Sequence, residues 1–104
     1  MTSFHERERA FENKFAHDAE MQFKAVARRN KRVGLWAAGL LGRTGADAEA
    51  YAMEVIRVDF EEAGPENVIQ KLIQDLGGRA DEATIRATMD RLLSEVKAEM
   101  LRDG

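Results

Sequence analysis

The stretch that decides the fold is VGLWAAGLLG, from Val33 to Gly42, the longest run of the sequence without a charged residue. It is about half the roughly 20 residues that a helix needs to cross a bilayer, so we expect a buried helix end and no membrane insertion. Glycine at position 42 suits the left-handed conformation that ends many helices. The pattern therefore predicts a first helix that runs to about Leu41 and stops there.

Upstream of this stretch, large apolar residues recur with a helical period. The stripe consists of Phe4, Phe11, Phe15, Ala19, Phe23 and Val26. Ser3 followed by Glu6 is a capping box, so the first helix is predicted to begin near Phe4 and to continue without a break. Because the stripe is one residue wide over its first four turns, it buries little surface within its own domain.

Downstream, helix-ending and helix-starting residues divide the chain into three further predicted helices. A second helix is expected over residues 46–62, and Pro65 suits the first turn of a third that ends before Gly77 and Gly78. Asp81 is placed to cap a fourth. Glycines at positions 34, 39, 42 and 45 punctuate the chain around the apolar cluster of residues 35–41, and the first helix of the chain is predicted to end at Gly42.

The apolar faces of these helices have the period of a packed core. They comprise Ala48, Tyr51, Ala52, Val55 and Val58, then Val68, Ile69, Leu72, Ile73 and Leu76, and finally Ile85, Met89, Leu92, Leu93, Val96 and Met100. Trp36, Tyr51 and Phe60 are assigned to the same bundle. We therefore expect an all-α fold, with an N-terminal arm (1–20), partly disordered or an extended helix, and a small four-helix bundle (21–104).

The net charge of −3 is unevenly distributed along the chain. Residues 1–33 carry a charge of +3 and residues 34–104 a charge of −6. The chain has no cysteine, which excludes a disulfide framework and thiolate chemistry. Together with the absence of a signal-peptide pattern at the start, this leads us to expect a cytoplasmic protein.

Little in the sequence points to catalysis. His5 and His17 would lie about 18 Å apart along a helix, so one metal ion cannot bind both. No serine or cysteine nucleophile accompanies them, and the glycine spacing fits no phosphate-binding loop. We expect no enzyme activity, no metal and no cofactor.

A basic cluster follows the stripe. It contains Lys24, Arg28, Arg29, Lys31 and Arg32, with no acidic residue among them. The acidic body and the lack of interleaved aromatic residues disfavour nucleic acid, and the alanines opposite the charges disfavour a membrane surface. A solvated face or a contact for an acidic protein surface explains the cluster better.

The phenylalanine stripe has two interpretations that spacing alone leaves open. The rings of Phe4, Phe11, Phe15 and Phe23 are either core residues of a first helix that packs on the bundle, or anchors that a mobile amphipathic segment buries in a partner.

Several runs carry a family resemblance. KFAHDAE (14–20), FKAVARRN (23–30) and GLWAA (34–38) resemble the alphaproteobacterial zeta subunit family, the ATPase inhibitor of the F-type ATP synthase. The likeness extends through residues 51–68 and thins out after about Leu76. It implies a four-helix domain with an N-terminal inhibitory segment that is mobile when free. In the family this segment becomes helical between catalytic subunits of the ATP synthase head and blocks rotation during hydrolysis while permitting synthesis.

The resemblance also assigns partner contacts and a location. The arm would contact the catalytic and rotor subunits through Phe4, Arg7, Glu8, Phe11, Phe15, His17 and Asp18. The basic anchor would comprise Lys24, Arg28, Arg29 and Lys31. The protein would then sit in the cytoplasm, peripheral to the inner membrane through the ATP synthase. The alternative is a small helical regulatory protein that binds a nucleotide weakly and does not inhibit strongly.

Overall fold

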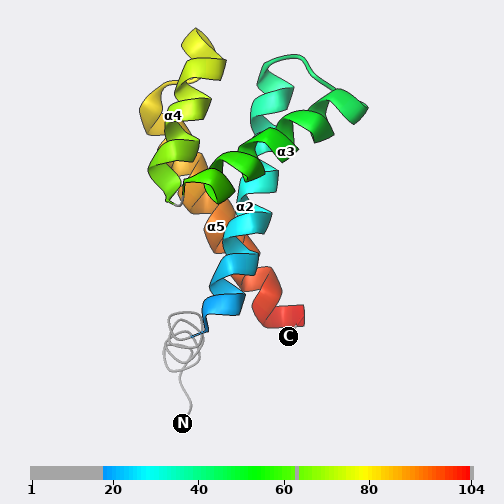
Figure 1. Cartoon of the computed structure of the whole chain (residues 1–104), viewed down its shortest axis with the longest axis vertical. Helices are drawn as coiled ribbons and strands as arrows, with labels where there is room; N and C mark the ends of the chain where they lie inside the picture. Colours follow the sequence, from blue (N-terminus) through cyan, green and yellow to red (C-terminus); the bar gives the residue numbers. More distant parts are fainter. Residues whose placement is uncertain (1–17, 63, 104) are drawn as a thin grey trace.

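The computed structural model describes residues 18–62 and 64–103, in which four α-helices and one short 3₁₀ turn follow one another. They are α2 (Ala19–Leu40), α3 (Gly45–Glu61), α4 (Pro65–Leu76), η1 (Gly77–Arg79) and α5 (Glu82–Asp103), labelled as in Figure 1. Within these ranges there is no β-strand, which confirms the predicted all-α class and the four helices. The division into an arm of residues 1–20 and a body of residues 21–104 stays a prediction.

The helix ends lie where local sequence signals placed them. Gly42 adopts a φ of +77°, and the N–H groups of Gly42 and Arg43 donate to the carbonyls of Gly39 and Ala38 at 3.1 and 2.9 Å. This is the hydrogen-bond pattern of a Schellman cap. Pro65 opens α4, and the carboxylate of Asp81 accepts the N–H of Thr84 at 2.7 Å at the start of α5.

The N-terminal part of the first predicted helix differs from the expectation. Asp18 has an extended backbone, with φ −109° and ψ 95°, and its side chain accepts the N–H of Met21 at 3.1 Å. An uninterrupted helix from Phe4 to Leu41 is therefore wrong at Asp18. An aspartate side chain that accepts a hydrogen bond from a nearby backbone N–H stabilises a helix start rather than a helix interior. The spacing of apolar residues carries no information about this hydrogen bond, so the break was not predicted. Residues 1–17 lie outside the described residues.

The described helices form an elongated body. Its principal extents are 49 × 25 × 24 Å and its Cα radius of gyration is 15.0 Å, larger than the about 13 Å of a compact chain of this length. Figure 1 shows the reason: α2 and α5 cross along the long axis, while α3 and α4 cover only the upper end. The lower end is a stalk made of the N-terminal half of α2 and the C-terminal half of α5.

Two hydrophobic clusters match this division. The main core joins all four helices through Val33, Ala37, Ala38, Tyr51, Val55, Val68, Ile69, Leu72, Leu76, Ile85, Met89 and Leu92. The stalk has a smaller cluster of Ala25, Val96 and Met100, with Met21 and Leu93 packed against it. The predicted core faces of α3, α4 and α5 are thus buried, and the stalk ties the start of α2 to the end of α5.

Helices α2 and α3 lie in close backbone contact at Gly34. A Cβ atom at this position would lie 2.7 Å from the Cα of Ala52, closer than two carbon atoms can pack. Gly34 lies inside α2 and is buried there, in agreement with a first helix predicted to run to about Leu41. It serves helix packing, and the break in the chain comes at Gly42.

A polar network fastens α3 to α4 beside the main core. The hydroxyl of Tyr51 donates to Asp75 at 2.7 Å, and the ammonium of Lys71 lies 2.9 Å from the same carboxylate oxygen. Burial and the hydrogen bond to Asp75 raise the pKa of Tyr51 well above its usual range. Partial burial opposes ionisation of Asp75, but hydrogen bonds from Lys71 and Tyr51 outweigh it and lower the pKa of this carboxyl.

The Gly34 contact predicts opposite effects of one methyl group at two positions of α2. Gly34→Ala should lower the free energy of unfolding by about 2 kcal/mol, because the added Cβ overlaps the α3 backbone. Gly39→Ala is the matched control, since no atom lies within 4 Å of its Cβ position, and it should raise stability by up to about 1 kcal/mol through helix propensity. Urea denaturation followed by circular dichroism measures both, and equal effects would contradict the packing role.

The hydrogen bond between Tyr51 and Asp75 predicts a loss of stability that depends on pH. Tyr51→Phe keeps the buried ring but removes the hydrogen bond, and should lower the free energy of unfolding by about 1 kcal/mol at neutral pH. Since the folded pKa of Asp75 is lowered, its contribution is present above the usual aspartate value of about 3.9 and is lost as the pH falls through the folded value. The difference between variant and parent, followed by urea titrations at several pH values, should shrink in acid. A constant difference would show that ionised Asp75 is not involved.

Candidate protein-interaction site

The predicted arm contacts lie almost wholly outside the described residues. This holds for Phe4, Arg7, Glu8, Phe11, Phe15 and His17. Asp18 is the exception, and the structure gives its carboxylate a local role as the N-cap of α2. Partner binding through these seven residues stays a prediction.

The basic cluster divides between the surface and the interior. Lys24, Arg28 and Lys31 are exposed on α2. The ammonium of Lys24 lies 3.2 Å from Glu20, and that of Lys31 lies 3.9 Å from Glu49. Exposed pairs of this kind contribute about 0–1 kcal/mol, so a partner can replace them at little cost.

Arg29 does not share that surface. It is only 6% exposed, and its Nε donates to the side-chain oxygen of Asn30 at 3.1 Å. Burial lowers the pKa of this guanidinium, while the carboxylates of Asp59 and Asp90 partly restore it. Sequence proximity grouped Arg29 with its neighbours, but each helix residue rotates about 100° from the previous one, and this step turns the side chain inward. The exposed anchor is therefore Lys24, Arg28 and Lys31.

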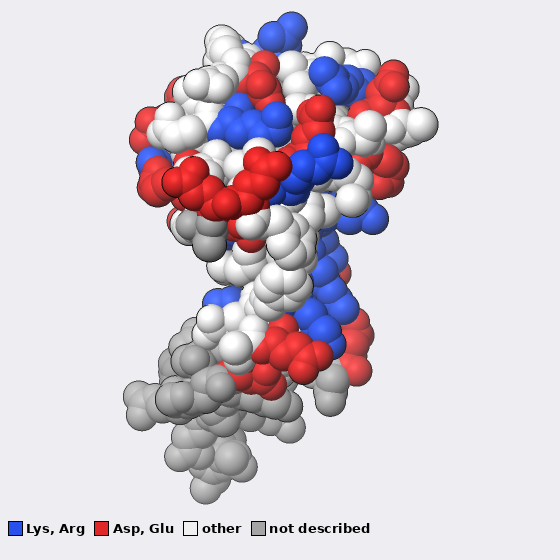
Figure 2. All heavy atoms as spheres, in the orientation of Figure 1, with Lys and Arg blue, Asp and Glu red and all other residues white. Residues whose placement is uncertain are grey.

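An apolar groove lies where the stalk meets the upper part of the body. It has a volume of about 460 Å³ and lies between α2, the α3–α4 junction and α5. Residues that line this waist groove include Phe23, Val26, Arg29, Asp59, Pro65 and Leu93. Figure 2 shows a strip of uncharged surface in the middle of this level, with basic side chains along its right-hand edge and charged side chains above and below it.

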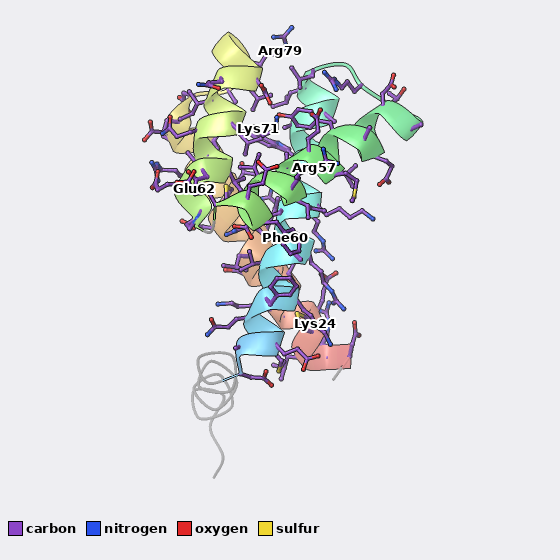
Figure 3. The ribbon with its side chains drawn as sticks, viewed as in Figure 1. Lys24, Arg57, Phe60, Glu62, Lys71 and Arg79 are labelled. Atoms are coloured by element: carbon purple, nitrogen blue, oxygen red, sulfur yellow. The ribbon has the colours of Figure 1, made fainter. Side chains whose placement is uncertain are left out.

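Two exposed aromatic rings mark this waist. Phe23 on α2 is 56% exposed and Phe60 on α3 is 66% exposed, and their ring centroids lie 5.6 Å apart in an edge-to-face arrangement. Figure 3 shows Phe60 at the level where α3 crosses α2, above Lys24. A paired, exposed aromatic surface beside an apolar groove is typical of a protein-interaction site.

Phe60 is a surface residue, which corrects its predicted assignment to the bundle interior. A signal was present: Phe60 lies nine residues after Tyr51, about 180° away from it around a helix. Tyr51 is buried in the main core, so Phe60 faces the opposite direction. Its proximity to Phe23 could not be foreseen, since it depends on how α3 crosses α2.

The described residues offer no metal site. Among residues 18–62 and 64–103, no three His, Asp or Glu side chains come together closely enough to hold an ion. In the same ranges, no helix combines the length and the apolar composition that a membrane span requires.

Comparisons with known proteins identify the family and the fold. The family described as ATPase inhibitor subunit zeta matches residues 1–99 of the chain. A solved structure titled "Solution NMR structure of the protein" is 50% identical, with a TM-score of 0.72, and the match covers 81% of this chain and 99% of that one. No curated protein matches.

The Asp18 cap predicts a local effect at the start of α2. Asp18→Ala removes the side-chain acceptor for Met21 and should destabilise this helix end by about 1 kcal/mol. Hydrogen exchange of the first amides of α2 should speed up, while amides of the main core keep their rates. Asp18→Asn is the control, because asparagine caps about as well as aspartate. Faster exchange in both variants would show that the charge of Asp18, and not its capping bond, protects the helix start.

Proposed function

The chain belongs to the ATPase inhibitor subunit zeta family, and from this premise we propose that it blocks ATP hydrolysis through its N-terminal segment. Residues 1–20 enter an interface between catalytic subunits of the F-type ATP synthase head, where they become helical and stop rotation in the hydrolysis direction. As an inhibitor subunit the protein is not an enzyme. Its partner is the ATP synthase, and it occupies the cytoplasmic side of the inner membrane through that complex.

The extent of the family match supports this proposal most directly. It spans residues 1–99 and so includes the arm as well as the helical body. A family match confined to the helical body would give no information about the function of residues 1–17. Their composition also suits a segment that orders on a partner, since three phenylalanines recur among charged residues of both signs.

The body presents the arm to the enzyme. α2 begins directly after Asp18, so the stalk holds the root of the arm in place. The exposed cations Lys24, Arg28 and Lys31 lie on this same helix, next to the arm, where they can meet acidic groups of the ATP synthase head. Charges at the edge of an interface act mainly on the rate and orientation of binding.

The proposed contact residues of the arm fall into two groups, aromatic and polar. The rings of Phe4, Phe11 and Phe15 supply most of the buried apolar area. Arg7, Glu8, His17 and Asp18 fix the register by charge pairing and hydrogen bonds. Burial of aromatic anchors gives affinity, whereas the flanking charges select the correct interface.

Deletion of the arm tests the function. A chain that lacks residues 2–17 retains Asp18 and the whole body, so it should keep its helical circular dichroism and lose inhibition of ATP hydrolysis by the cognate ATP synthase head. Asn13→Ala, a substitution within the arm but outside the predicted contacts, is the matched control and should inhibit like the parent. Undiminished inhibition by the deleted chain would contradict the proposal.

A further inference from the structure

We propose that the waist groove is the docking site for the arm of the same chain when the protein is free. Residues 1–17 fold back along α2, and Phe11 and Phe15 pack against Phe23 and Phe60. This goes beyond the proposed function, because it concerns the chain without its partner. It accounts for an apolar surface on the body whose two exposed rings, Phe23 and Phe60, belong to neither core cluster.

The entry point of the arm favours this occupant over others. Ala19, the first residue of α2, itself lines the groove, so the arm joins the body at the edge of its own docking site. From Ala19 to Arg29 the groove extends about 15 Å along α2. Seventeen residues span about 26 Å as a helix and more if extended, so the arm is long enough in either conformation.

The backbone at Asp18 permits the return. A helix that continued unbroken through this residue would carry the arm away from the body along the α2 axis. The extended conformation of Asp18, with φ −109° and ψ 95°, ends α2 at this residue, so the α2 helix does not continue into the arm. The same carboxylate caps α2 and so stabilises the break.

The chemistry of the groove matches that of the arm. Its walls offer Phe23, Val26 and Leu93, against which further aromatic rings can bury apolar surface. The groove is also lined by the buried Arg29 and by Asp59. Burial lowers the pKa of this guanidinium, and the carboxylate of Asp59, with that of Asp90, raises it against the effect of burial.

Docking has a consequence for affinity. A ring that is buried in the waist groove is hidden from the partner, so only the undocked fraction of the protein is competent to bind. The apparent dissociation constant rises in inverse proportion to that fraction. The groove thus competes with the partner protein for the arm. It also covers apolar rings that would otherwise promote aggregation.

Paramagnetic relaxation measures the docking in the full-length chain. Because the sequence has no cysteine, Ala10→Cys provides a single attachment point for a nitroxide within the arm. The amide signals of Gly64 and Leu93, at the groove, should be lost. Signals of Leu101, at the end of α5 near the start of α2, should be retained, as should those of Gly78 at the far end.

A matched variant and a mixing experiment define the other outcomes. Phe11→Ser combined with Phe15→Ser leaves the described body untouched and should restore the Gly64 and Leu93 signals. Equal loss at Leu101 and Leu93, unaffected by these substitutions, would overturn the proposal and show an unattached arm. Loss at the groove when spin-labelled chains are mixed with unlabelled, nitrogen-15-enriched chains would assign the groove to a second copy, which also overturns it.

Discussion

The close contact between the backbones of α2 and α3 at Gly34 and Ala52 is the constraint on which the rest of the body depends. Because position 34 has no side chain, α3 can lie directly on α2, and this brings Tyr51 and Val55 into the main core. Tyr51 in turn reaches Asp75 on α4. α4 and α5 then complete a core whose geometry the first two helices have set.

The two halves of helix α2 pack in different surroundings. Its C-terminal half is buried in the main core, and its N-terminal half contacts α5 through the small stalk cluster. The waist groove lies where these environments meet, since α3 ends and α4 begins there and one side of α2 below them is left uncovered. The exposed aromatic surface is therefore a result of unequal helix lengths as much as of local composition.

Sequence reasoning succeeded where the controlling interactions are local. Gly42, Pro65 and Asp81 end or start helices through their own backbones or side chains, so their effects can be predicted without the fold. It failed at Asp18, where a capping bond competes with an otherwise good helical pattern. The burial of Arg29 and the pairing of Phe60 with Phe23 depend on how helices cross, which no single-sequence pattern encodes. The arm contacts stay predictions.

The stalk also has a mechanical consequence. Ala25, Val96 and Met100 are the only buried apolar side chains of its cluster, against twelve in the main core. A region with so few buried contacts opens at a lower free energy than the core. A pulling force applied at Ala19 acts on this small cluster before it acts on the main core, so we expect α2 to separate from α5 before the main core is strained.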